Sequence, residues 1–395
     1  MKRRWIVAAL AAVAAAAGCN GHSSAGAPPA RPGHTEYLPP AGNGVPERTR
    51  MGRAERALDL VVWNGYSASA LIGPFQTETG CAVHAIRAPG LGRMAALLAS
   101  GRYDGVLAAG DASARLIQAK LVAPLDTGLV PTFGQLDSKL QSQAFDTVNG
   151  VHYGVAYQWA ANALLYNTKL VKPAPVSWSV VFDGQSYKGN VSVYDSPMSI
   201  AIAAQLLKAS QASLGITDPY ELTQPQFQAA VVAMETQHVQ VGHYWTDPTA
   251  LVHDFEDGRV VIGEGWPGQA SALAGEHEPV ASVIPSEGVT GWADTWMMAA
   301  LAPHPNCMLR WLQYTATPIA QGETALAFGS APANPQACTY LDGLHPGYCV
   351  AHHVTDSAYL NAIAYWKTPF ADCGNGNTNC IPYPEWTRAW KVIRG

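Results

Sequence analysis

The chain has 395 residues, of which 13% are charged and 48% are hydrophobic, and its formal net charge is −5. This length exceeds what a single hydrophobic core usually supports, so we expect two lobes or domains. The mildly acidic balance argues against nucleic acid as a partner.

The N-terminus has the layout of a secretory signal peptide. A basic start at residues 2–4 is followed by an apolar stretch and by small residues up to Cys19. The apolar run is too short for a transmembrane anchor, so we expect residues 1–18 to be removed. The ending Ala-Ala-Gly-Cys resembles a bacterial lipobox, which implies lipidation of Cys19, although Ala16 stands where that motif prefers Leu. Removal of three basic residues would leave 21 against 29 acidic ones, a net charge of −8.

Residues 19–57 form a different kind of segment. They are rich in Pro, Gly, Ala and Ser and show no sustained apolar periodicity. Such a sequence buries too little apolar surface to offset its conformational entropy, so it predicts a flexible tether. We therefore expect an exported protein, either lipid-anchored on the outer face of the cytoplasmic membrane or periplasmic.

From Leu58 onward, short apolar strands alternate with helices. Strands are predicted at 58–63, 82–86 and 103–108, and helices at 68–78 and 91–101. A third helix ends near Leu121, and Asp111 would serve as its N-cap or as a ligand contact. This order predicts an α/β fold with a parallel sheet and crossover helices, whose ligands bind beyond the carboxyl ends of the strands.

Aromatic residues lie at several predicted strand boundaries, where they would line such a ligand site. They are Trp63, Tyr66, Trp159, Trp266 and Trp292. Core packing is the competing explanation for each ring. Asp294 lies two residues beyond the last of them, and rings with a nearby carboxylate suit a cationic ligand. The rings supply cation–π attraction, and the carboxylate pairs with the ammonium group.

Six cysteines remain besides Cys19, an even number in an exported chain, so we expect disulfides. They are Cys81, Cys307, Cys338, Cys349, Cys373 and Cys380. The spacing leaves the pairing open, although pairs 338–349 and 373–380 would each close a short loop. Because no Cys-x-x-Cys occurs, we expect no structural zinc, and nothing in the sequence calls for a cofactor.

Seven stretches, in this order and spacing, resemble the spermidine/putrescine-binding proteins of bacterial ABC importers. They are WNGYSASALIGPFQTETG, YDGVLAA, YGVAYQWAANALLYN, the YKG of QSYKGNVSVYD, GRVVIGEGWPG, IPSEGVTGWADTWMMA and FGSAPAN. The resemblance implies a bilobal type II periplasmic-binding fold, in which two α/β lobes joined by a hinge enclose a ligand cleft. Lobe one would comprise 58–160 plus 293–337, and lobe two 161–292 plus 338–395.

The resemblance also implies roles for individual residues. Trp63 and Tyr66 match the aromatic pair after the first strand, and Asn64 stands where the family often has a hydroxyl residue. Trp266 and Trp292 match the tryptophans that flank the polyamine. Asp294 matches the carboxylate that receives an amino group.

Departures from the family pattern predict an altered pocket. Ser196 and Ser199 stand where acidic residues are usual, Asp111 and Ser330 stand at or beside aromatic positions, and Glu264 is a candidate second carboxylate. The full set of expected ligand contacts is Trp63, Asn64, Tyr66, Asp111, Trp159, Asp195, Ser196, Ser199, Glu264, Trp266, Trp292, Asp294 and Ser330.

The function implied is capture of a polyamine or related cationic amine by a monomer that delivers it to ABC permease subunits in the membrane. A different small solute on the same fold, such as an amino acid derivative, an opine-like compound or a metal, is the alternative. An exported enzyme is a further one, but Gly-x-Ser-x-Gly, His-Glu-x-x-His and phosphate-loop motifs do not occur. We therefore expect no catalytic residues.

Overall fold

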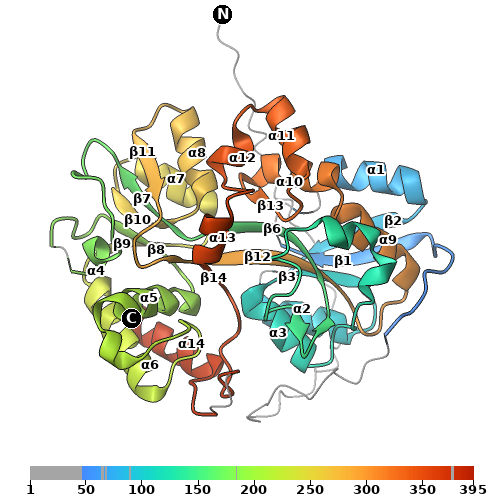
Figure 1. Ribbon diagram of the computed structural model, residues 1–395, viewed down its shortest axis with the longest axis horizontal. Coiled ribbons are helices and arrows are strands. Elements are labelled where there is room, and N and C mark those ends of the chain that lie inside the picture. Colours follow the sequence, from blue (N-terminus) through green and yellow to red (C-terminus); the bar gives the residue numbers. More distant parts are fainter. Residues whose placement is uncertain (1–46, 64–65, 67–68, 89, 184, 375–377) are drawn as a thin grey trace, which may run out of the picture. The chain divides into compact units, whose positions relative to one another are not determined.

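The structure is a computed structural model that describes residues 47–63, 66, 69–88, 90–183, 185–374 and 378–395. Within these residues two β-sheets with flanking helices make up two α/β lobes, as the sequence predicts (Figure 1). Among the described helices, none combines the length and the apolar character that a membrane span requires.

The larger sheet has seven strands and forms the first lobe. Its strand order is β13-β6-β12-β3-β1-β2, with β14 paired to β12. The strands are β1 (Ala57–Val62), β2 (Ala82–Arg87), β3 (Gly105–Ala109), β6 (Val155–Ala161), β12 (Val289–Met298), β13 (Ala331–Pro332) and β14 (Ile363–Tyr365). Strand β1 is parallel to β2 and β3, whereas β12 is antiparallel to β3 and β6. The sheet is therefore mixed, and the expected parallel pairing occurs among β1, β2 and β3 and between β12 and β14.

The smaller sheet has five strands in the order β11-β7-β10-β8-β9 and forms the second lobe. They are β7 (Ala163–Asn167), β8 (Val191–Tyr194), β9 (Val241–Trp245), β10 (Ile262–Gly265) and β11 (Val280–Val283). The chain passes from β6 to β7 through Asn162 alone, and it returns to the larger sheet as β12. A separate hairpin pairs β4 (Thr147–Val148) with β5 (Val151–His152).

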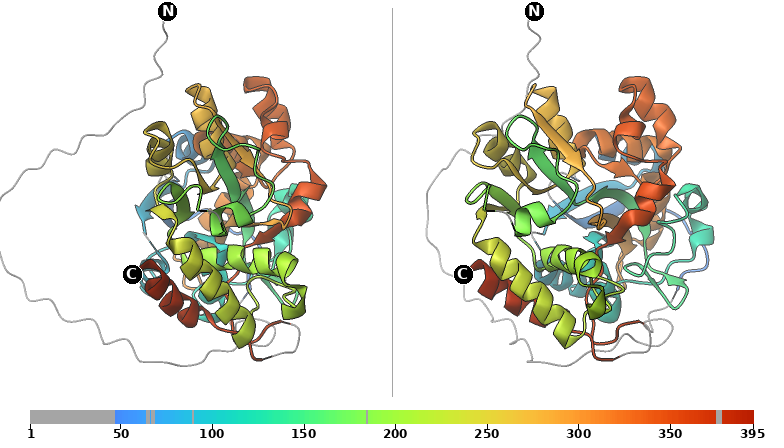
Figure 2. Two further views of the ribbon diagram at one scale, coloured as in Figure 1. Left: turned by 90° about the vertical axis from the view of Figure 1, so that its left-hand side faces the viewer. Right: turned by 60° about the vertical axis from the view of Figure 1, so that its left-hand side comes forward.

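Helices cover both sheets, and Figure 1 shows α5, α6 and α14 on one side of the smaller sheet. Figure 2 shows α14 beside α6, which it contacts. The α-helices are α1 (Ser69–Thr79), α2 (Leu91–Ala99), α3 (Gly110–Gln118), α4 (Ser179–Phe182), α5 (Ile200–Ser210), α6 (Gln224–His238), α7 (Pro248–Glu256), α8 (Pro267–Gly275), α9 (Pro305–Thr315), α10 (Pro318–Phe328), α11 (Ala337–Leu344), α12 (Tyr348–Ala351), α13 (Ser357–Ala362) and α14 (Tyr383–Arg394). Short 3-10 helices are η1 (Thr127–Leu129), η2 (Pro131–Gln135), η3 (Pro197–Ser199) and η4 (Ala212–Leu214).

The C-terminal segment contacts both lobes. Helix α11 packs on α10, and β14 pairs alongside β12. Residues 337–365 therefore lie largely against elements of the larger sheet. Helix α14 packs on α6 and on η3, which belong to the second lobe. The residue ranges predicted for each lobe remain a proposal, and we use "first lobe" for the elements of the larger sheet, β12 and β14 included, and "second lobe" for those of the smaller sheet.

The first predicted elements lie close to their expected positions, but the N-cap of the third helix does not. Helix α3 begins at Gly110, and its N-cap is Ala109, whose backbone is extended. Asp111 lies inside the first turn and makes no cap hydrogen bond, so its predicted capping role is wrong. A carboxylate in the first turn still interacts favourably with the helix dipole.

The expected disulfides are confirmed. Cys81 pairs with Cys307, and the two short loops are closed by Cys338–Cys349 and Cys373–Cys380. The first bridge joins residues 226 positions apart, linking the start of β2 to α9. Closing such a long loop restricts the unfolded chain strongly.

Candidate functional site

An aromatic cluster lies where strands of the two sheets meet. The ring of Trp266 packs edge-on against Trp292 at 5.4 Å and against Trp245 at 4.9 Å. Tyr194 lies 5.7 Å from Trp266 and stacks on Trp366 at 5.6 Å. Trp292 and Trp366 come from the first lobe, and the other three rings come from the second. The cluster therefore joins the two lobes through aromatic faces and edges.

The positions of these rings in the cluster follow from the strands that carry them or that end beside them. Trp266 follows β10 directly and is the N-cap residue of α8, while its indole Nε1 donates to Asn162 Oδ1 at 2.9 Å. Tyr194 is the last residue of β8. Trp292 lies inside β12, and Trp159 lies inside β6, so these two rings are not at strand boundaries as the sequence predicted.

Asp294 is the first of three carboxylates near the rings. It lies on β12 two residues beyond Trp292 and is 6% exposed. Tyr66 donates its hydroxyl hydrogen to Asp294 Oδ2 at 2.6 Å, and the Tyr66 ring stacks on Phe328 at 4.4 Å. Burial raises the pKa of Asp294 to about 7, although the Tyr66 hydrogen bond opposes the shift. Among the described residues, Asp294 forms no ion pair.

Glu264 is the second carboxylate and lies on β10, two residues before Trp266. Its Oε2 accepts hydrogen bonds from the Tyr194 backbone N–H and from the Ser199 hydroxyl, each at 3.1 Å. The side chain is buried, and burial raises its pKa to about 8. The second oxygen, Oε1, has no hydrogen-bond partner in the part of the chain that is described.

Asp111 is the third carboxylate and differs in having a cation nearby. Burial raises its pKa, and the Arg115 guanidinium partly opposes this. The Arg115 side chain donates to the Asp111 backbone carbonyl and lies over the Tyr383 ring. All three carboxylates contribute to the raised pKa of the Tyr194 hydroxyl, after the larger effect of its burial. Of the three, Glu264 is the one with a hydrogen bond to Tyr194, through the Tyr194 backbone N–H.

Several polar atoms in this region are buried without a partner among the described residues. They are the indole Nε1 atoms of Trp292 and Trp366 and Oε1 of Glu264, and the indole Nε1 of Trp63, directly after β1, is likewise unpaired. Buried polar groups in folded proteins nearly always find a partner, so orphaned ones call for an explanation. Oε1 of Glu264 is an acceptor that an ammonium group can bond, whereas the indole N–H groups are donors and would need an acceptor atom on the ligand.

Other predicted residues make bonds that explain their positions without a ligand. Asp195 pairs with Arg394 at 2.9 Å and accepts from Trp390 Nε1, which ties α14 to the end of β8. Ser196 accepts from the Met198 N–H as the N-cap of η3. Their assignment as ligand contacts stays a prediction.

Trp159 and Ser330 belong to a buried network on the first lobe. Trp159 Nε1 donates to the Pro332 carbonyl at 3.1 Å, and the Ser330 hydroxyl donates to Gln158 Oε1 at 2.7 Å. The predicted contact Asn64 and the predicted lipidation site Cys19 lie outside the described residues. Four residues beside the carboxylates escaped the sequence reasoning, namely Asn162, Tyr194, Trp245 and Trp366.

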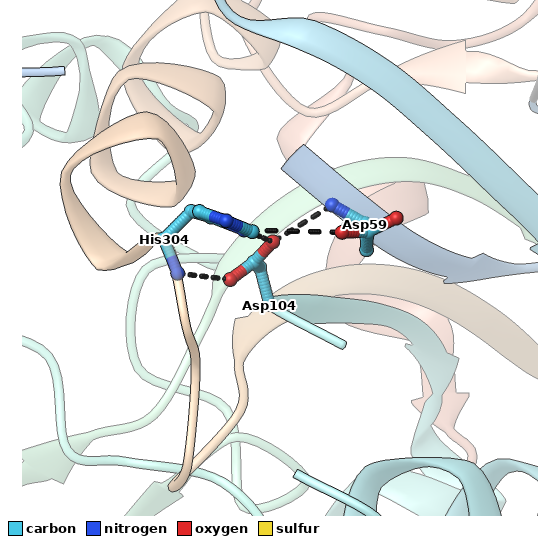
Figure 3. Close-up of side chains that lie close together, drawn as sticks. All are labelled: Asp59, Asp104 and His304. Carbon is cyan, nitrogen blue, oxygen red and sulfur yellow. Dashed lines mark hydrogen bonds and ion pairs between the residues drawn. The ribbon is translucent and has the colours of Figure 1, made fainter. Parts of the chain in front are cut away.

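A separate cluster on the first lobe brings Asp59, Asp104 and His304 within metal-binding reach (Figure 3). The fully buried Asp104 accepts from the Asp59 N–H at 2.7 Å, from the His304 N–H at 2.5 Å, and contacts His304 Nδ1 at 2.9 Å. Both of its oxygens are therefore already bonded. The cluster ties β1, β3 and the start of α9 together, and this accounts for the burial of the Asp104 charge.

Comparison with known proteins gives the same picture of the fold. Residues 70–340 match the family model described as bacterial extracellular solute-binding protein. The putrescine/agmatine-binding protein of Pseudomonas aeruginosa is 25% identical over 308 residues, covering 73% of this chain and 81% of that protein. The putrescine/cadaverine-binding protein of the same organism is 25% identical over 304 residues, covering 73% and 82%.

Solved structures share the fold at lower sequence identity. The spermidine/putrescine ABC transporter substrate-binding protein of Streptococcus pneumoniae superposes with a TM-score of 0.68 at 18% identity, covering 86% of this chain and 99% of that one. The periplasmic binding protein MotA of A. tumefaciens B6, solved with glucopine, gives a TM-score of 0.67 at 15% identity, covering 86% and 100%. Proteins with different ligands thus share this two-lobed fold.

Proposed function

The chain belongs to the bacterial extracellular solute-binding protein family, and on that premise we propose that it captures a linear polyamine or a related cationic amine for import. This family consists of binding proteins rather than enzymes. The proposal rests chiefly on Asp294, a buried carboxylate beside aromatic rings that has no cationic partner in the described part of the chain.

The chemistry of the cluster favours a cation of this kind. A buried carboxylate without a counterion is costly, and an ammonium group that pairs with it removes that cost. Trp266, Trp292 and Tyr194 offer ring faces to the methylene chain and to the charge. The relatives from Pseudomonas aeruginosa named for putrescine binding support the same ligand class.

The two lobes explain how capture proceeds. Trp292 and Asp294 come from the first lobe, whereas Trp266 and Glu264 come from the second, so the ligand contacts are complete only when the lobes close. Closure by hinge motion then presents a ligand-dependent surface to an ABC permease in the membrane. We propose further that the protein acts as a monomer, held at the membrane by a lipid on Cys19 and by the tether of residues 20–57.

Isothermal titration calorimetry of the purified protein tests this function. Putrescine, cadaverine, agmatine and spermidine are the ligands, and an Asp294→Asn variant removes the charge while keeping the side-chain shape. We expect Asp294→Asn to weaken binding of any cationic ligand by about 2–4 kcal/mol, since it removes one partner of a buried ion pair. Asp183→Asn, on an exposed position of the second lobe, is the matched control and should change nothing. Absence of heat and of thermal stabilisation with every amine would refute the proposal.

A further inference from the structure

Glu264 is a buried carboxylate with half of its hydrogen-bonding capacity unused. Only 2% of the residue is exposed. Oε2 is held by the Tyr194 N–H and the Ser199 hydroxyl, which fixes the side chain in place. Oε1 is buried and has no partner among the described residues. An acidic oxygen in this state is a strong acceptor for a group that the protein itself does not supply.

The surroundings of Glu264 repeat those of Asp294. Glu264 precedes Trp266 by two residues and Asp294 follows Trp292 by two, and residues two apart in an extended strand share one face. Trp292 therefore lies on the same side of β12 as Asp294, whereas Trp266 directly follows β10, the strand that carries Glu264, as the N-cap residue of α8. The two indole rings contact each other at 5.4 Å. Each lobe thus contributes one carboxylate and, two residues away in the chain, one tryptophan of a contacting pair.

Asp111 does not compete with Glu264 for the same role. The Arg115 guanidinium acts on Asp111, whereas among the described residues no basic side chain acts on Glu264. Ser199 also distinguishes the two, because its hydroxyl oxygen lies 3.1 Å from Glu264 Oε2 and 2.9 Å from the Tyr194 carbonyl oxygen and so helps to hold Oε2 in place. Glu264 is thus the positioned carboxylate of the second lobe that lacks a cation.

We infer that Glu264 receives a second cationic group of the ligand, so that the site selects linear amines that carry a positive charge at both ends. The first ammonium group pairs with Asp294 on the first lobe, and the second pairs with Oε1 of Glu264 on the second lobe. The methylene chain between them lies along the tryptophan rings. This inference rests on the proposed function, and it identifies a residue that sets specificity within that function.

A comparison of a diamine with a monoamine of equal chain length tests the inference. Calorimetry of the purified full-length protein with 1,4-diaminobutane and with 1-aminobutane gives the ratio of the two affinities. We expect the wild-type protein to favour the diamine on the order of 100-fold, as loss of one buried charge pair implies. In Glu264→Gln this ratio should fall to within about threefold, because the monoamine uses Asp294 alone.

Two further variants separate the possible outcomes. Glu235→Gln, exposed on α6, is the control and should leave both affinities unchanged. Asp294→Asn should weaken the diamine and the monoamine alike. If wild-type protein binds both amines equally, or if folded Glu264→Gln keeps the wild-type ratio, the inference is wrong while the proposed function stands. If wild-type protein binds neither of these amines and also fails to bind cadaverine, agmatine and spermidine, the proposed function fails as well.

Discussion

The affinity for a diamine should depend steeply on pH. In the ligand-free protein, burial raises the pKa of Asp294 to about 7 and that of Glu264 to about 8. A carboxyl group must be ionised to pair with an ammonium group, and alkyl amines stay protonated up to about pH 9. Binding therefore releases protons, and the affinity rises as the pH increases through these two pKa values.

The size of the effect follows from the same two pKa values. At pH 6 protonation of Asp294 weakens binding about tenfold and protonation of Glu264 about 100-fold, since each pH unit below a pKa costs a factor of ten. At pH 8 only a factor of about two remains, for Glu264, so the affinity rises on the order of 500-fold between pH 6 and pH 8. If Asp294 alone met the ligand, the rise would be about tenfold.

Calorimetry with 1,4-diaminobutane in two buffers of different ionisation enthalpy measures the proton release directly. At pH 7 we expect release of about 1.4 protons, the sum of about 0.5 from Asp294 and about 0.9 from Glu264. In Glu264→Gln the release should fall to about 0.5. An affinity independent of pH with no proton release would refute the assignment of these two carboxylates to the ligand.

Three further predictions concern closure and stability. A Cβ at Gly268 of α8 would lie 2.4 Å from the carbonyl oxygen of Gly329, the residue that follows α10. Gly268→Ala should therefore oppose lobe closure and weaken amine binding in calorimetry at least tenfold. An unchanged affinity would contradict this. Cys81→Ser should lower the free energy of unfolding in urea by about 3–5 kcal/mol, because it breaks the disulfide between two cysteines that lie 226 positions apart. An unchanged urea midpoint of unfolding would show that this disulfide contributes little. Asp104→Ala should cost about 2–4 kcal/mol in the same assay, because the backbone N–H groups of two other residues lose their acceptor, whereas exposed Asp183→Ala should cost little.

Local patterns in the sequence carried much of the fold. Alternating apolar strands and helices from Leu58 predicted β1 to α3, because period and turn residues act over a few positions. The aromatic residues with their carboxylates at 264–266 and 292–294 were visible for the same reason. The resemblance to a family added the two-lobed arrangement, which no local pattern shows.

Long-range pairing explains what the sequence did not reveal. Trp366 contacts Tyr194 because the preceding strand β14 pairs with β12. These two strands lie about 70 residues apart in the chain, and no local sequence pattern predicts their pairing. Asp195 was predicted as a ligand contact because the sequence does not show its ion pair with Arg394, almost 200 residues further along the chain. Likewise Asp111 is of a residue type favoured at N-caps, but its helix begins two residues earlier than a cap at Asp111 would require.

Native mass spectrometry of the exported protein, purified from cells without added ligand and then denatured to release whatever it holds, tests the central claim most directly. We expect a linear amine with cationic groups at both ends to be released unchanged from wild-type protein, and much less of it from Asp294→Asn. Release of a neutral or anionic solute, together with no binding of diamines on titration, would contradict the account.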